Sequence, residues 1–540
     1  TMEPLADLLS WRNAALAAAL YSVYFASLVF YRLFLHPLAS FPGPKRAAAT
    51  YLYEGYHDVI RNGQYTFRIA ELHRKYGPII RINPNELHVI DPSFYKVIYR
   101  HDGIWNKDPW AYSAQPPRAA AIMTVDHHQH KARRSPFNGY FSKAKISTRQ
   151  DMLHRHLGTL CDRIEQFADS STTFDLGHSA SAFTRDVGDE YILGLNFHNL
   201  EQHDFNRDLT NMLQSVGYIW RTNKQMPFIY LSTIMMSIPQ ALVMLFADAG
   251  TRSLFGYLNS TREITERTMK EWSQERPSTS SSTTDPESKK QGSGSQRTII
   301  HEVLDSNLPP SDKQCDRIWD ETTTITGAGF ETTANIARTI YFHLWSNPAM
   351  LRRARQELAY HHIPYEIAEL DVKALEKLPY LTAIICEGMR LSPGISTRMG
   401  RVAPDRDIIY VDRQVNSTGK REWVIPKGYT VGMTTLLMHL DEELYPDPKQ
   451  FRPERWIDGP DGVNARKVAE GNGTFAPFSR GTRICLGMYL AWAELYLLLA
   501  ALIQRFDFEF AGAKAEDLLC TSDQFVIGTD GGSELKSKAT

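Results

Sequence analysis

Cysteine is scarce in this chain, with five residues among 540, at positions 161, 315, 386, 485 and 520. So few and so widely spaced cysteines exclude the disulfide framework of a small secreted protein and favour a reducing compartment. An excess of either charge is also missing, because 60 Lys and Arg residues face 61 Asp and Glu residues. A chain this close to neutrality has no general field for nucleic acid, so any basic patch has to be local.

Internal repeats and low-complexity composition are lacking as well. With 43% hydrophobic and 22% charged residues, the chain is neither disordered nor collagen-like, and it can bury a large core. Its length of 540 residues suits two or three ordinary domains, or one large unit built around a cofactor.

A long uncharged run lies near the beginning of the chain, between Arg12 and Arg32. About 20 apolar residues suffice to cross the hydrocarbon core of a membrane, so residues 1–35 are predicted to contain a membrane-anchor helix. A cleaved signal peptide is the alternative, but the run is long and no clear small-residue cleavage site follows it. More basic residues follow the run than precede it, which predicts that the bulk of the chain faces the cytosol.

Residues 36–46 are rich in proline, with Pro37, Pro42 and Pro44. Proline fixes φ and disfavours helix in the residue before it, so this hinge should end the anchor helix. The hinge should also hold the body of the chain, residues 47–540, at a set distance from the bilayer.

Two segments interrupt that body. Residues 275–297 are rich in Ser, Thr, Gly and charge, and they have too little apolar surface to offset the entropy of ordering, which predicts a flexible surface loop. Residues 225–247 form a second uncharged stretch, but Pro227 and Pro239 interrupt it. A buried or membrane-dipping hairpin is therefore favoured over a second membrane span.

The second half of the chain alternates long helical patterns with short strand-like pieces. Apolar residues recur at helical spacing over 316–345 and 347–362, whereas 407–412 and 430–435 have the pattern of strands. The sequence therefore predicts a mainly α protein with small β-sheets.

The most specific pattern is FSRGTRICLGMYLAWAE, residues 478–494. It resembles the haem-binding signature of the cytochrome P450 family. The resemblance implies a single large P450 fold, a haem b cofactor, and Cys485 as the thiolate ligand of the iron. A thiolate in that position pushes electron density into the metal and favours cleavage of the O–O bond. The matching residues are Phe478, Gly481, Arg483, Cys485, Gly487, Ala491 and Glu494.

The surroundings of Cys485 agree with this role. Gly487 would let the backbone approach the cofactor and aim amides at the sulfur, and the apolar run from Leu486 begins a helix whose N-terminus favours an anion. By the resemblance, Phe478 borders the cofactor and Arg483 contacts a haem propionate. The alternative is that Cys485 is a buried thiol in a loop, as free cysteines commonly are.

Glu387 and Arg390 in CEGMR are three residues apart, close enough to meet on one helical face. They resemble the family's Glu-x-x-Arg pair, and Arg455 in FRPERW stands where the family has the third member of the network. Trp456 stands where the family often has Phe. The resemblance implies a structural network, costly to bury unless complete, that braces the segment before the ligand loop. Ordinary surface ion pairs are the alternative.

The segment GAGFETT, residues 327–333, lies inside a long helical pattern, although a glycine in a helix interior costs about 1 kcal/mol relative to alanine. It resembles the family motif at which the helix opens locally over the iron. The resemblance implies that Glu331 and Thr332 form the catalytic acid and alcohol pair that passes protons to bound dioxygen. The alternative is glycine-mediated helix packing, with threonines bonding their own backbone.

Residues 126–141, DHHQHKARRSPFNGYF, resemble the family helix that reaches the haem propionates, here through His130 and Arg134. The usual residue at the first of these positions is Trp, but His can still donate a hydrogen bond. Three histidines in this segment could suggest a metal site, yet no carboxylate or cysteine nearby completes one. Arg398, in STRMGR, is implied as a further propionate contact.

The segment 63–89 is similar to that of filamentous-fungal members of the family that oxidise secondary metabolites, such as trichodiene oxygenase. The resemblance implies electrons from NADPH through a separate flavoprotein reductase, and dioxygen as co-substrate. It implies an endoplasmic reticulum membrane protein with its catalytic domain in the cytosol.

The family places substrate-pocket walls near Phe330, Ile395 and Thr397, and these apolar surroundings suit a lipophilic terpenoid, polyketide or alkaloid. No nucleic-acid partner is expected. Two other classes stay open. One is a haem-thiolate enzyme that couples, dehydrates or isomerises without inserting oxygen, and the other is a non-catalytic membrane scaffold that has lost haem.

Overall fold

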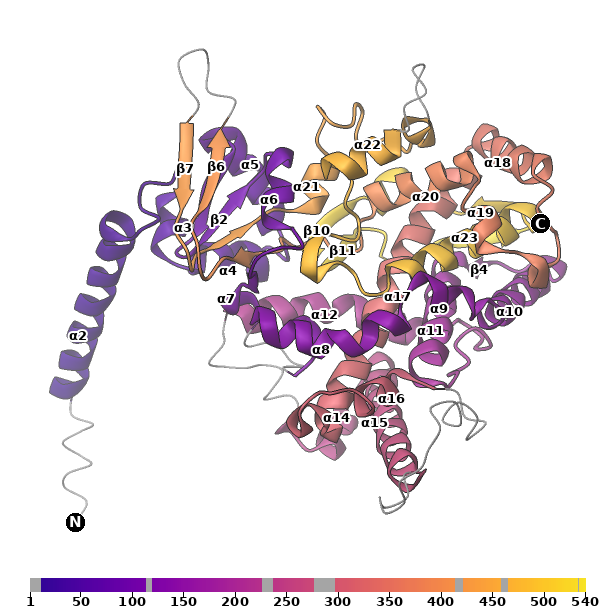
Figure 1. The fold of residues 1–540 in the computed structure, drawn as a ribbon, viewed down its shortest axis with the longest axis horizontal. Helices are drawn as coiled ribbons and strands as arrows, with labels where there is room; N and C mark the ends of the chain where they lie inside the picture. The colour runs from indigo at the N-terminus through magenta and orange to yellow at the C-terminus, as the bar shows by residue number, and fades with distance from the viewer. Residues whose placement is uncertain are drawn as a thin grey trace, which may run out of the picture.

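The computed structural model shows a mainly helical protein with small sheets, as the sequence predicts (Figure 1). Of the predicted loop 275–297, only the two end residues belong to the described part of the chain. The middle of the predicted hairpin 225–247 also lies outside the described residues. The described residues are 11–112, 119–225, 237–275, 297–412, 421–457, 465–532 and 534–540.

The centre of the helical core is α17 (Cys315–Trp345), which packs most extensively on α11 (Leu176–Leu193). Every residue of α11 except Glu190 is buried. The almost continuous apolar run after the signature loop becomes α23 (Met488–Arg505), which is buried from Ala493 to Ile503. A helix that is apolar on all sides belongs in the interior, so the ligand loop is attached directly to the core.

Shorter helices surround this core. One of them, α20 (Pro379–Leu391), carries Glu387 and Arg390 of the predicted network. Another, α8 (His127–Tyr140), contains the histidine-rich segment. The remaining helices are α3 (Lys45–Ala49), α4 (Leu52–Gly55), α5 (Tyr65–Tyr76), α6 (Tyr95–Ile98), α7 (Pro109–Tyr112), α9 (Lys143–Ser147), α10 (Gln150–Asp169), α12 (Arg207–Gln225), α14 (Gln240–Phe246), α15 (Ala249–Glu275), α16 (Ile299–Leu304), α18 (Pro348–Tyr360), α19 (Val372–Leu375), α21 (Thr435–His439) and α22 (Ala465–Asn472).

The largest sheet has the strand order β1-β2-β8-β5-β3. Only the β2–β8 pair in it is parallel, and the strand-like segments predicted near 407–412 and 430–435 form β6 and β8. The sheet strands are β1 (Ile79–Asn83), β2 (Glu86–Val89), β8 (Thr430–Gly432), β5 (Arg401–Val402) and β3 (Asn106–Lys107). The others pair as β4 (Phe174–Asp175), β12 (Lys536–Ala539) and β9 (Phe508–Phe510), as β6 (Ile408–Asp412) and β7 (Arg421–Ile425), and as β10 (Cys520–Gln524) and β11 (Val526–Thr529).

The helix α2 (Trp11–Phe30) continues as a π-helical turn, Tyr31–Leu35, and stands away from the body of the molecule (Figure 1). None of its residues is buried. Within the described residues it is the one helix that is long and apolar enough to cross a membrane, which makes it a candidate anchor.

The proline-rich hinge is packed on the sheet rather than extended into solvent. Leu38 and Phe41 are buried in the core around that sheet, and the Arg81 backbone N–H of β1 donates to Pro42 O at 2.7 Å. A Cβ on Gly43 would lie 2.5 Å from Arg81 O, so only glycine allows this approach. The anchor therefore joins the body through a docked segment.

Of the described residues in the predicted hairpin, only Ala247 is buried. In α14, Leu245 is 70% exposed and Phe246 is 91% exposed. Burial does not fit these residues, and contact of this part with a membrane stays a prediction.

Candidate active site

The signature loop is closed by its own backbone. The Cys485 N–H donates to Phe478 O at 2.9 Å, and the chain then enters α23. Gly481 has φ +76, and a Cβ there would lie 2.5 Å from Arg100 O. Glycine at this position is therefore required by the left-handed backbone and by the close approach of the Arg100 backbone.

The Cys485 side chain is accessible to solvent, but protein surrounds it and this burial raises the pKa of the thiol. The backbone N–H groups of Gly487 and Met488, at the beginning of α23, hydrogen bond to the sulfur and act in the opposite direction, as does the positive charge of Arg134. A Cβ on Gly487 would meet no atom within 4 Å. The sulfur thus has the donors that a thiolate needs and an open side where a metal can bind.

Five basic side chains form a largely buried basic cluster next to this loop. Burial, together with the charges of Arg401 and Arg134, lowers the pKa of Arg483 to about 9. Burial and the neighbouring Arg483 and Lys107 lower the pKa of His130 to about 2. The members of the basic cluster are Lys107, His130, Arg134, Arg401 and Arg483.

No carboxylate of the described residues lies within 4.0 Å of any nitrogen of the basic cluster. Arg483 donates instead to the carbonyls of Thr124 at 2.6 Å and Val125 at 2.9 Å, and its Nε is buried without a partner. Lys107 donates to Ile122 O at 2.5 Å. Because buried positive charge is costly without a counter-charge, the basic cluster fits an acidic group such as the two propionates of haem.

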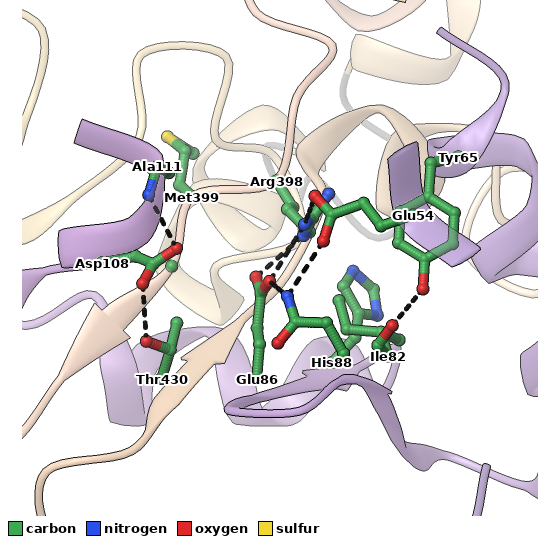
Figure 2. Close-up of polar contacts among 12 residues, drawn as sticks. Glu54, Tyr65, Ile82, Glu86, His88, Asp108, Ala111, Arg398, Met399 and Thr430 are labelled. Carbon is green, nitrogen blue, oxygen red and sulfur yellow. Dashed lines mark hydrogen bonds and ion pairs between the residues drawn. The ribbon is translucent and has the colours of Figure 1, made fainter. Parts of the chain in front are cut away.

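Arg398 does not belong to the basic cluster. Its Nε donates to Glu86 Oε1 at 2.8 Å and its Nη2 to Glu54 Oε1 at 2.6 Å (Figure 2). These carboxylates already compensate its charge, so the geometry does not fit the expected propionate contact. Arg401, in the same STRMGR segment, lies in the basic cluster instead. Sequence reasoning missed Arg401 and Lys107, and only a second arginine in STRMGR hinted at the first of them.

The GAGFETT segment presents an open face in the middle of α17. Gly327 and Ala328 are exposed although most of this helix is buried, and a Cβ on Gly327 or Gly329 would meet nothing within 4 Å. The helix is continuous here, without the expected local opening. Thr332 Oγ1 donates to Ala328 O at 2.8 Å, the backbone bond of the alternative interpretation.

Glu331 points toward α11 rather than toward this open face. Arg338 Nη2 donates to Glu331 Oε2 at 2.8 Å, and Arg338 Nε donates to Gly177 O of α11 at 3.1 Å. Burial alone would raise the pKa of Glu331, but Arg338 and Arg185 outweigh it and the pKa is lowered. Glu331 is therefore an ionised carboxylate, and its Oε1 is buried without a partner.

Another carboxyl group lies near the same helix turn. Glu494 of α23 is 3% exposed and shares a hydrogen bond with the Thr333 side chain. Burial raises the pKa of Glu494 well above its ordinary value, so its neutral form is favoured over a wider pH range than that of an exposed glutamate. Thr333 therefore contacts a second carboxyl group, while its neighbour Thr332 directly follows Glu331 in the chain.

Glu387, Arg390 and Arg455 come together as one buried network. Arg390 donates to Glu387 through Nε at 2.9 Å and Nη2 at 2.7 Å, and Arg455 Nε donates at 2.9 Å. The indole N–H of Trp456 donates to the same carboxylate at 2.8 Å, a bond that phenylalanine could not make. Arg390 also donates to the carbonyls of His439, Pro448 and Gln450.

Of the predicted pocket residues, Phe330 is buried between helices, whereas the pocket role of Ile395 and Thr397 stays a prediction. Phe330 is 1% exposed and packs against α11 and α15, so it is not a wall. Ile395 and Thr397 are half-buried and alternate with fully buried neighbours. A Cβ on Gly394 would lie 3.2 Å from Thr332 Cβ, which places this segment beside the open face of α17.

A family model described as Cytochrome P450 matches residues 50–533. The cytochrome P450 monooxygenase tpcC of Cochliobolus heterostrophus is 36% identical over 93% of this chain and 92% of its own length. The N-acetyltryptophan 6-hydroxylase ivoC of Emericella nidulans is 34% identical over 96% and 94%. The cytochrome P450 monooxygenase TRI4 of Fusarium sporotrichioides is 33% identical over 93% and 90%. The matches run through both the fold and the signature loop, and the chain belongs to the cytochrome P450 family of monooxygenases.

Proposed function

We propose that this cytochrome P450 hydroxylates a lipophilic secondary metabolite, with haem b as cofactor and dioxygen as co-substrate. Electrons come from NADPH through a separate flavoprotein reductase. The observation that carries the proposal is the basic cluster, without a carboxylate partner in the described chain, beside an accessible cysteine at a helix N-terminus. The fungal relatives named as a monooxygenase and a hydroxylase support the reaction type.

The cofactor would be held from two sides. Cys485 would supply a thiolate ligand to the iron, Gly487 would leave room beside it, Phe478 would border the cofactor, and the basic cluster would bind the propionates. Arg134 contributes to both sides, because its Nη1 donates to Ile484 O at 2.6 Å and its charge favours the thiolate. When bound, haem supplies the activation of dioxygen that lets an unreactive C–H bond be hydroxylated.

The chain's own contribution to the chemistry is proton handling at Thr332 and Glu331. The Thr332 hydroxyl lies on the open face and can exchange its bond to Ala328 O for a donor role toward that face. Glu331, ionised by its pair with Arg338, points toward α11 and would have to turn toward the open face before its Oε1 could accept a proton from water and return it. These two residues are therefore the proposed acid and alcohol pair.

The substrate is proposed to be a terpenoid, polyketide or alkaloid intermediate that contacts Ile395 and Thr397. The relative named as an N-acetyltryptophan 6-hydroxylase supports hydroxylation of a small organic molecule. Oxidative coupling, dehydration or isomerisation is the competing reaction type. Incorporation of label from isotopic dioxygen into the product supports hydroxylation, and turnover without label supports the alternative.

The enzyme is proposed to sit in the endoplasmic reticulum membrane through α2, with its catalytic domain in the cytosol. The exposed apolar surface of α2 and the basic residues that follow it support this arrangement. In microsomes, added protease should degrade the catalytic domain without detergent. Protection until the membrane is dissolved would place the domain in the lumen.

The test of the cofactor site is the absorption spectrum of the reduced, carbon monoxide-bound protein. Wild type should show the red-shifted Soret band of a thiolate ligand, and Cys485→Ser should lose it. Cys386→Ser is the matched control, because Cys386 is buried in α20 and should leave the band unchanged. Haem binding without that band in wild type would remove the monooxygenase proposal.

A further inference from the structure

Segment 119–125, which precedes α8, is tied to α17 through its own backbone. The Ala121 N–H donates to Glu321 Oε2 at 2.9 Å, and the Ala119 N–H donates to Asp320 Oδ2 at 3.2 Å. The two carboxyl groups are neighbours near the beginning of α17, about 200 residues later in the chain. One short stretch of this helix therefore supplies the acceptors for two backbone donors of the segment.

Glu321 takes the place of a missing helix cap. A short 3-10 turn, Ala121–Met123, lies in the segment, and its N-cap residue is Ala120, whose side chain cannot accept a hydrogen bond. The first N–H groups of a helical turn have no partner inside the turn, and a buried N–H without an acceptor is costly. Ala121 is 7% exposed and Glu321 is 2% exposed, so the protein rather than water has to supply the acceptor. The carboxyl group of Glu321 therefore fixes where this turn begins.

The other end of the segment is held by the basic cluster. Lys107 donates to Ile122 O, and Arg483 donates to the two carbonyls that follow Met123. Between the two ends, the apolar side chains of Ile122 and Met123 are half-buried. The open face of α17 begins less than two turns after Glu321. The segment thus borders the space between that face and the basic cluster, where haem and a ligand of the proposed function would lie.

We propose that Glu321 is a positioning residue that holds segment 119–125 as a fixed wall of the substrate pocket, with Asp320 as a second attachment. This inference rests on the pocket of the proposed function. Glu321 acts through the Ala121 N–H, which sets where the side chains of Ile122 and Met123 lie. A fixed apolar wall binds a bulky ligand more tightly than a mobile one, because less conformational freedom is lost on binding. The attachment therefore matters for ligands that reach the wall and not for small ones.

The charge of Glu321 is compensated within α17. Arg317 Nη1, one turn earlier, lies 2.5 Å from Glu321 Oε2, and Arg317 Nε lies 3.7 Å from Asp312 Oδ1. Burial raises the pKa of Glu321, whereas Arg317 and the Ala121 N–H act in the opposite direction. A carboxyl oxygen accepts a hydrogen bond in both the ionised and the neutral form, so the attachment persists whichever form is present. Removal of the Glu321 side chain also changes the surroundings of Arg317, so a second variant has to leave these charges in place.

Two variants break the hydrogen bond from opposite sides in the full-length, haem-loaded protein. Glu321→Ala removes the acceptor, whereas Ala121→Pro removes the donor and keeps every charge on α17. Proline suits the first position of a helical turn, and Ala120 already has the extended backbone, with φ −64° and ψ 148°, that a residue before proline favours. The matched control is Glu357→Ala, because Glu357 of α18 also accepts two backbone N–H groups of another helix, at the beginning of α20, at 2.7 and 2.8 Å.

The probes are imidazole and 4-phenylimidazole, whose dissociation constants are measured from the Soret shift. In Glu321→Ala and Ala121→Pro, 4-phenylimidazole should bind about tenfold more weakly than in wild type, equivalent to ~1.4 kcal/mol, while imidazole binds as in wild type. General destabilisation of the fold would not separate the two ligands. A ratio of the two constants equal to that of wild type in both variants, or the same change of ratio in Glu357→Ala, would overturn the proposal.

Hydrogen exchange separates failure of this inference from failure of the proposed function, because it needs no haem signal. Backbone amides of residues 122–125 should exchange faster in Glu321→Ala and Ala121→Pro than in wild type and in Glu357→Ala. If wild type lacks the thiolate band, the proposed function fails, and hydrogen exchange then decides whether Glu321 holds the segment. Exchange as slow as in wild type would remove Glu321 as its attachment.

Discussion

The carboxylate of Glu387 accepts five hydrogen bonds, including three from guanidinium nitrogens and one from the Arg452 backbone N–H at 2.9 Å. In Glu387→Gln the charge is lost and an NH₂ group faces these donors, while Arg390 stays completely buried. Removing one partner of a buried ion pair costs about 3–5 kcal/mol, because the remaining charge has no compensation. We therefore expect Glu387→Gln to lower the free energy of unfolding by that amount.

The matched control is Glu454→Gln, which breaks an exposed ion pair with Arg353 whose N–O distance is 3.0 Å. An exposed pair contributes about 0–1 kcal/mol. Urea unfolding of the haem-loaded protein, followed by circular dichroism, measures both variants. With a slope of roughly 3 kcal/mol per molar urea, the midpoint of Glu387→Gln should fall by about 1 M or more. A midpoint equal to that of Glu454→Gln would refute the network as a buried, mutually dependent unit.

Three other substitutions test the site. Because burial raises the pKa of Glu494, protonated Glu494 stabilises the fold at acidic pH, and this contribution is lost as pH rises through its folded-state pKa. Glu494→Gln should therefore be as stable as wild type in acid and should lose less stability as pH rises. Urea midpoints measured at several pH values test this expectation. Arg401→Gln should release haem to apomyoglobin about 10–100-fold faster, since a hydrogen bond to a charged group contributes roughly 1.5–3 kcal/mol, and an unchanged rate would remove Arg401 from the propionate site. Thr332→Val should fold normally but form more hydrogen peroxide per NADPH consumed, and unchanged coupling would contradict a role in proton delivery.

Much of the site could be predicted because its signals are local in the sequence. The Cys485 loop and the beginning of α23 follow from one continuous motif, and the pair of Glu387 with Arg390 follows from helical spacing. The ionisation of Glu331 was also within reach, because Arg338, seven residues later, lies two turns along the same face of α17.

The parts that sequence reasoning missed depend on contacts between distant segments. In STRMGR, the sequence makes Arg398 and Arg401 equally plausible as propionate contacts. In the fold, α4 and β2 supply carboxylates to Arg398, and β5 carries Arg401 into the basic cluster. Lys107 has no sequence neighbour that indicates a cofactor contact. Phe330 is predicted as a pocket wall but packs on α11. The rotation of α17 about its own axis decides which residues face α11 and which face the open side, and the sequence does not show this rotation.

The basic cluster has a consequence for engineering of this enzyme. Lys107 and Arg483 hold the carbonyls of residues 122–125 with the same side chains that are proposed to hold the cofactor. Substitutions in this stretch that are chosen to widen substrate scope will therefore also change how firmly the prosthetic group is retained. A mutant library over residues 119–126 should accordingly be sorted first for haem content, since apparent losses of catalytic activity there will often be losses of holoenzyme.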